Sequence, residues 1–80
     1  MNHYTATFHT HVSALLTCRA LNERGIKARM APVPRSLSSS CGTCVLYDAE
    51  GPNTDGMDRD VEKIFLMEQD GSFTLLYTNE

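Results

Sequence analysis

Two cysteines, Cys41 and Cys44, stand three residues apart in the stretch SLSSSCGTC. A cysteine thiolate is both a nucleophile and a metal ligand, so a close pair in a chain with no export signal indicates redox or metal chemistry. The third cysteine, Cys18, shares a predicted helix face with apolar residues and is interpreted as a small core residue. Because three is an odd number, the composition argues against a framework of structural disulfides. Cys41 and Cys44 are therefore the candidate catalytic residues.

The backbone between the two thiols decides whether they can form a disulfide. Residues three apart in an extended strand are separated by roughly 10 Å, whereas a disulfide needs Cα atoms within about 7 Å. A turn at Gly42 would allow the bridge without requiring it. Residues 45–47 have the pattern of a strand, so the pair differs from CxxC motifs that open a helix.

The elements that position the pair begin with a strand and a helix. Apolar and polar residues alternate over residues 3–9, which predicts a half-buried strand. A helix is expected over residues 11–24, with Thr10 as its N-cap and Gly25 as its left-handed end. Its buried face is predicted to carry Ala14, Leu15, Cys18 and Leu21.

A second strand is predicted over residues 26–30, and the prolines that follow are expected to end it. Because proline has no N–H to give a sheet, residues 31–35 should leave the sheet as a stiff arm. Residues 36–40 form a serine-rich loop, and a third strand begins at residues 44–47.

The C-terminal part allows two interpretations. Residues 49–60 have the composition of a surface excursion, with a solvated acidic cluster at Asp55, Asp58 and Asp60. Beyond it, Asp70-Gly71 between two apolar arms favours a hairpin in which Gln69 faces Ser72 and Phe65 faces Leu76. The alternative is a second helix over residues 57–68 and a final strand over residues 72–78.

Both interpretations give one domain over residues 1–80, an α+β two-layer sandwich with one main helix on a mostly antiparallel sheet. The net charge of −3 argues against sequence-independent nucleic-acid binding. The longest apolar stretches are far shorter than the ~18 residues of a membrane span, and the N-terminus does not resemble a signal peptide. We therefore expect a cytoplasmic protein that binds neither nucleic acid nor membrane, and an uncovered edge strand would allow a homodimer.

The topology predicts where the cysteine loop lies. If a right-handed crossover joins the first two strands, these strands run parallel, and the loops after them meet at one edge of the sheet. A thiolate or anionic adduct on Cys41 would then face Thr10, His11 and the other N–H donors at the helix start, together with Arg35.

Besides a thiol that carries an adduct, other functions fit the same residues. Cys41, Cys44, His9 and His11 would supply an acceptable tetrahedral zinc set, and zinc is the alternative to a protein without cofactor. A non-catalytic interaction module is a further alternative. A carrier that holds its cargo on a cysteine fits these residues better than a stand-alone enzyme.

The run APVPRSLSSSCG resembles the segment that marks the putative selenium/sulfur carrier protein-like family of small bacterial proteins, and the resemblance covers residues 4–48. It implies a ferredoxin-like βαββ(α)β variant and a carrier in which Cys41 holds a persulfide or selenosulfide. Cys44 stands where the family often has an apolar residue, and this second thiol could resolve the adduct. The implied partners are proteins that donate and accept sulfur or selenium. The residues that surround the carrier cysteine in this resemblance are Pro34, Arg35, Ser39, Ser40 and Gly42.

Overall fold

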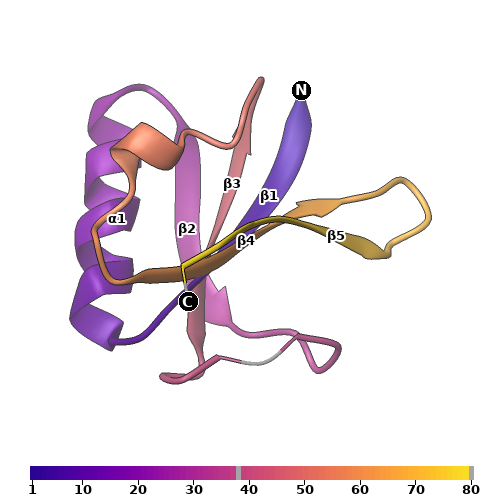
Figure 1. Cartoon of the computed structure of the whole chain (residues 1–80). Helices are drawn as coiled ribbons and strands as arrows, with labels where there is room; N and C mark the ends of the chain where they lie inside the picture. Colours follow the sequence, from indigo (N-terminus) through magenta and orange to yellow (C-terminus); the bar gives the residue numbers. More distant parts are fainter. Residues whose placement is uncertain (38, 80) are drawn as a thin grey trace.

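A computed structural model, which describes residues 1–37 and 39–79, places one helix on one face of a five-stranded sheet (Figure 1). The helix α1 spans His11–Glu23. The strands are β1 (Asn2–Phe8), β2 (Lys27–Pro32), β3 (Thr43–Ala49), β4 (Val61–Met67) and β5 (Phe73–Thr78). Their order in the sheet is β2-β3-β1-β4-β5, and every neighbouring pair is antiparallel. The predicted α+β class is confirmed. Residue 38 of the predicted loop lies outside the described residues.

Strand β1 is the centre of the sheet, and both of its faces are buried. Tyr4, Ala6 and Phe8 belong to the core beneath α1. Thr5 and Thr7 point to the opposite face, as the alternation predicts, yet both are fully buried. The expected half-buried strand is therefore wrong in this respect, because β3 and β4 flank β1 on both sides and their side chains cover the threonines.

The predicted ends of α1 are confirmed. The Thr10 hydroxyl accepts a hydrogen bond from the Ser13 N–H at 3.1 Å, which makes Thr10 the N-cap. At the other end Gly25 has a φ of +83°, and the Ile26 N–H donates to the Leu21 carbonyl at 2.9 Å. This is the Schellman arrangement that glycine favours.

The buried face of α1 differs from the prediction at Leu15, which is 41% exposed. Ser13 and Thr17 point inward in its place. The Ser13 hydroxyl donates to Asp58 Oδ2 at 2.7 Å, and the Asp58 N–H donates to Thr17 Oγ1 at 3.0 Å. The helix thus turns its hydroxyl groups towards the segment before β4, and Asp58 holds that segment instead of being solvated.

Strand β2 runs two residues further than predicted, since Ala31 pairs with Cys44 and Pro32 with Thr43. The expected departure from the sheet at residue 31 is wrong. The sheet order explains this, because β2 is an edge strand and a proline at an edge need not donate to a neighbour.

The C-terminal hairpin is confirmed, and the helix alternative for residues 57–68 is wrong. A short 3-10 helix, η1 (Thr54–Gly56), stands between β3 and β4 where the predicted ferredoxin-like variant allows a second helix. Ile64 pairs with Tyr77, but after a bulge Phe65 pairs with Leu75 instead of Leu76. The turn causes the shift: the Glu68 N–H bonds to the Ser72 carbonyl at 2.8 Å, which leaves residues 69–71 as a three-residue loop with Gly71 at a φ of +87°.

Strands β1 and β2 run in the same direction because both are antiparallel to β3, which lies between them. The loops that follow them therefore leave the sheet at the same edge, next to the start of α1. In the part of the chain described here, no helix has the length and apolar character needed to cross a bilayer.

We predict that Asp58→Ala lowers the free energy of unfolding by about 2 kcal/mol, because it leaves the buried Ser13 hydroxyl without its acceptor. Urea denaturation would measure the change. Asp60→Ala is the matched control, since the Asp60 side chain is exposed, and an equal loss in both variants would contradict the role of Asp58.

Candidate functional site

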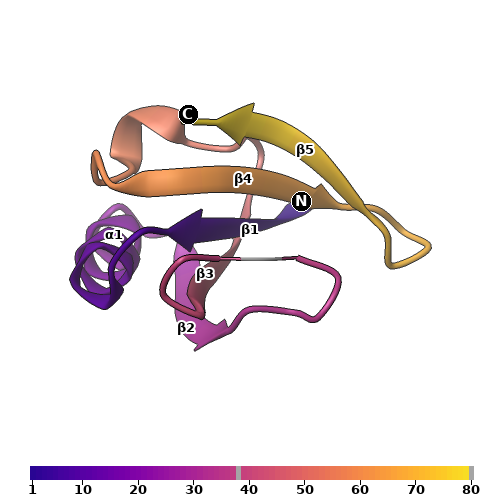
Figure 2. The ribbon, with the colours of Figure 1, turned by 60° about the horizontal axis from the view of Figure 1, so that its bottom comes forward.

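The loop between β2 and β3 carries Cys41 and returns towards the start of α1 (Figure 2). Its base is closed by a hydrogen bond from the Val33 N–H to the Gly42 carbonyl at 3.1 Å. A turn at its beginning is closed by a bond from the Leu37 N–H to the Pro34 carbonyl at 3.0 Å. Gly42 has a φ of +75°, a backbone conformation that favours glycine. Cys41 thus stands directly before a backbone reversal that feeds β3.

Two serines fasten this loop to the sheet. The Ser39 hydroxyl donates to the Phe8 carbonyl at the end of β1, at 3.1 Å. The Ser40 hydroxyl and N–H donate to the Glu62 carboxylate at 3.0 and 3.4 Å. Glu62 was not predicted as a site residue, because in the sequence it is an ordinary polar position in a strand. Only the pairing of β4 with β1 brings it here.

The two histidines near the start of α1 also contact this edge. His9 Nδ1 lies 3.4 Å from Ser40 Oγ and 3.8 Å from Glu62 Oε2. His11 Nδ1 lies 3.4 Å from Thr43 Oγ1. The structure therefore brings His9 and His11 to the edge where the Cys41 loop lies, and the loop itself carries Ser39 and Ser40.

Cys41 is the only one of the three cysteines that is partly exposed. Its thiol donates to the Thr43 carbonyl at 3.5 Å, and its Sγ lies 4.0 Å from Ser39 Oγ. The side chain packs against the apolar cluster beneath α1. A reagent can reach this sulfur from one side while the loop holds it from the other.

Cys44 is fully buried in β3, with its thiol directed to the Pro32 carbonyl at 3.7 Å. Val45 and Tyr47 belong to the cluster beneath α1, so by alternation Cys44 points to the opposite face of the sheet. Burial raises the pKa of the Cys44 thiol, and the charge of Cys41 adds to this, although the Arg29 guanidinium opposes it. Cys44 therefore stays a thiol, which is the poorer nucleophile.

No disulfide joins any of the three cysteines. Cys41 packs towards the helix side and Cys44 towards the other face, so the structure holds the two thiols of the CxxC sequence apart instead of pairing them. Cys18 lies in the core as predicted. Burial raises the pKa of its thiol, although a hydrogen bond from Asn22 acts in the opposite direction.

Two other predicted residues, Arg35 and Thr10, lie at the same edge of the sheet but form no hydrogen bond with Cys41. Arg35 is exposed in the turn of the loop and makes no ion pair with any described residue. The Thr10 hydroxyl is occupied as the N-cap of α1.

The predicted zinc set is not assembled. Within residues 1–37 and 39–79, no three His, Cys, Asp or Glu side chains are grouped so that they could hold a metal ion. The thiol of Cys44, one of the four expected ligands, donates a hydrogen bond to the Pro32 carbonyl and points to the face opposite α1. The donor set that this edge presents does not fit a tetrahedral zinc ion.

Comparison with known proteins gives one match. The model of a family described as "Putative Se/S carrier protein-like" matches residues 3–53, which include β1, α1, β2, the Cys41 loop and β3. Searches of the curated proteins and of the solved structures found no match.

We predict that Cys41 is alkylated by iodoacetamide before Cys18 and Cys44, because the other two thiols are buried and burial also raises their pKa values, which lowers their thiolate fraction. Timed quenching followed by peptide mass analysis would give the three rates. Labelling of Cys44 as fast as Cys41 in the folded protein would contradict the assignment.

We also predict that Glu62→Ala loosens the loop, because the hydroxyl and N–H of Ser40 lose their acceptor. Amide hydrogen exchange at residues 39–42 should become about fivefold faster, which corresponds to about 1 kcal/mol. Glu68→Ala is the control, since Glu68 accepts from Thr74 in the distant hairpin. Unchanged exchange in Glu62→Ala would show that Ser40 does not fasten the loop.

Proposed function

Since this chain belongs to the Se/S carrier protein-like family, we propose that it carries sulfur or selenium as a persulfide or selenosulfide on Cys41. The observation that carries the proposal is the contrast among the three cysteines: Cys41 is partly exposed in a fastened loop, whereas Cys18 and Cys44 are buried. A carrier needs a sulfur atom that both a donor and an acceptor can reach, and Cys41 alone meets that requirement.

The transfer steps balance without a further reagent. The Cys41 thiolate attacks the outer sulfur of a persulfide on the donor, the donor's S–S bond breaks, and the donor leaves as a thiolate. The moved atom is now the outer atom of a persulfide on Cys41, and selenium would move in the same way to give a selenosulfide. An acceptor thiolate then attacks this outer atom, and Cys41 leaves as a thiolate. The chain itself is neither oxidised nor reduced over the cycle.

The surroundings of Cys41 suit an anionic adduct. Ser39 Oγ lies 4.0 Å from the sulfur, but its single proton is donated to the Phe8 carbonyl, so stabilisation of the adduct falls to the positive groups near the loop. The positive end of the α1 dipole lies near the loop and favours a negative charge there. His11, the first residue of α1, contacts Thr43 next to the loop. The exposed guanidinium of Arg35 has no ion pair among the described residues, so it is available to an incoming anionic group.

Cys44 does not act as a resolving thiol in this proposal, although a second thiol near Cys41 could have that role. Its burial and raised pKa oppose an attack on the adduct. Release to an external acceptor therefore fits the site better than release through an internal disulfide.

The donor and acceptor proteins would approach over the outer surface of α1. Val12, Leu15 and Leu16 are 62%, 41% and 49% exposed there, directly after His11. We place the exchange in the cytoplasm, where thiols stay reduced. Pairing of two copies through an edge strand, β2 or β5, remains a prediction.

The test is loading in solution. After incubation with a low-molecular-weight persulfide and removal of the excess, intact mass should show one added sulfur per chain in the native protein and in Cys44→Ser. A second thiol added as acceptor should remove it. In Cys41→Ser the added mass should be absent, and loading that persists in this variant would overturn the proposal.

A further inference from the structure

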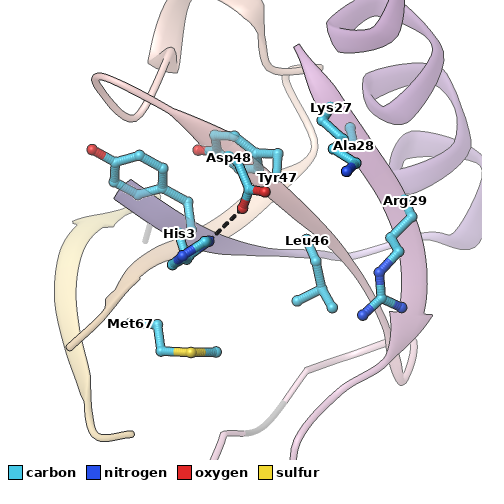
Figure 3. A pocket seen from close by; sticks show the side chains of 9 residues that line it. His3, Lys27, Ala28, Arg29, Leu46, Tyr47, Asp48 and Met67 are labelled. Carbon is cyan, nitrogen blue, oxygen red and sulfur yellow. Dashed lines mark hydrogen bonds and ion pairs between the residues drawn. The ribbon is translucent and has the colours of Figure 1, made fainter. Parts of the chain in front are cut away.

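A hollow lies on the face of the sheet opposite α1 (Figure 3), and its volume is about 490 Å³. It is centred on the end of the sheet where β1 and β2 begin, away from the Cys41 loop, which follows the other ends of these strands. Its volume lies in the range of sites for small organic molecules, roughly 300–1,000 Å³. Side chains from four strands line it: His3, Lys27, Arg29, Leu46, Asp48 and Met67.

The charges around this hollow leave two cations available. Asp48, the one carboxylate of the lining, is 2.5 Å from His3 Nδ1, so it already has a hydrogen-bond partner (Figure 3). Lys27 and Arg29 come from the edge strand β2, are exposed, and form no ion pair with a described residue. In a chain with a net charge of −3, two unpaired cations beside one hollow favour an anionic ligand.

The floor of the hollow is apolar. Leu46 of β3 and Met67 of β4 lie there, and the strand β1 between them contributes His3 (Figure 3). Beside the floor, Thr5 pairs with Leu46 and Phe65 on the same face, and its buried hydroxyl has no hydrogen-bond partner. Thr5 is fully buried and does not line the hollow, so the surface open to a ligand consists of the apolar floor and the charged side chains around it.

We propose that this hollow binds a small organic anion. Its acidic group, a carboxylate, phosphate or sulfonate, is held between Lys27 and Arg29, and its apolar body lies on Leu46 and Met67. Arg29 is the more specific of the two cations, since a guanidinium donates two parallel hydrogen bonds to such a group. The site is separate from the Cys41 chemistry and does not depend on the proposed carrier function.

The probe for the test is anilinonaphthalene sulfonate, which combines an anionic group with aromatic rings and fluoresces when it leaves water. N-phenylnaphthylamine has the same rings without the charge and is the matched neutral probe. Titrations of the full chain with both probes would be followed by fluorescence, and amide shifts in two-dimensional NMR spectra would locate the binding site.

We expect the sulfonate probe to bind more tightly than the neutral one and to shift the amides of residues 3, 27–29, 46–48 and 67. Arg29→Gln and Lys27→Gln should each weaken binding about tenfold, the effect of losing one hydrogen bond from a charged donor. Arg19→Gln, which removes an exposed charge from α1, should leave the affinity unchanged, as should Cys41→Ser.

Three results would overturn the proposal: equal affinity for the charged and neutral probes, no loss in either β2 variant, or amide shifts confined to other exposed apolar residues. Those residues are Val12, Leu15 and Leu16 of α1 and Leu75 and Leu76 of β5. The probe comparison and the NMR map use the native chain, so they decide the question even if a β2 variant fails to fold. Loss of loading at Cys41 would not affect this result, which keeps the two proposals separable.

Discussion

The position of β3 between β1 and β2 is the constraint on which the candidate site depends. Because β1 and β2, the two neighbours of β3, are both antiparallel to it, they end at the same edge of the sheet. The end of β1 leads into α1, and the end of β2 leads into the Cys41 loop. The loop then has three anchors within reach: its own closing bond at Gly42, the Phe8 carbonyl and the Glu62 carboxylate. A sheet with β1 and β2 adjacent would leave no strand for the loop to enter beside the helix start.

The same arrangement gives the two neighbouring cysteines opposite environments. Cys41 stands before the Gly42 reversal, where the side chain reaches solvent on one side and the core on the other. Three residues later the chain is part of β3, and Cys44 lies fully buried between β2 and β1, opposite Ala31 and Thr7. The two thiols are close only in the sequence, because the sheet directs them to different faces. Of this pair, Cys41 is the partly exposed thiol, whereas Cys44 is buried.

Local signals predicted the elements well because each depends on few residues. Thr10 caps α1 and Gly25 ends it for reasons contained within one helical turn. The errors arose where distant contacts decide. Leu15 is exposed because Ser13 and Thr17 face Asp58, and β2 continues to Pro32 because the sheet makes it an edge. The hairpin register shifted because the turn contains three residues instead of two.

Glu62 shows the same limit within the site. It stands 22 positions from Ser40, and nothing in its local sequence distinguishes it from other strand carboxylates. The hollow opposite α1 was likewise invisible in the sequence, because its lining comes from four strands that only the sheet order brings together.

Cys41 as the working thiol is tested most simply by the peptide-resolved mass of the chain isolated from cells without reductant. We expect a gain of one sulfur or one selenium atom, removed by a thiol reductant, on the peptide that contains Cys41. A gain located on Cys44 or Cys18, or a disulfide between Cys41 and Cys44 in place of the adduct, would show that Cys41 is not the single working thiol.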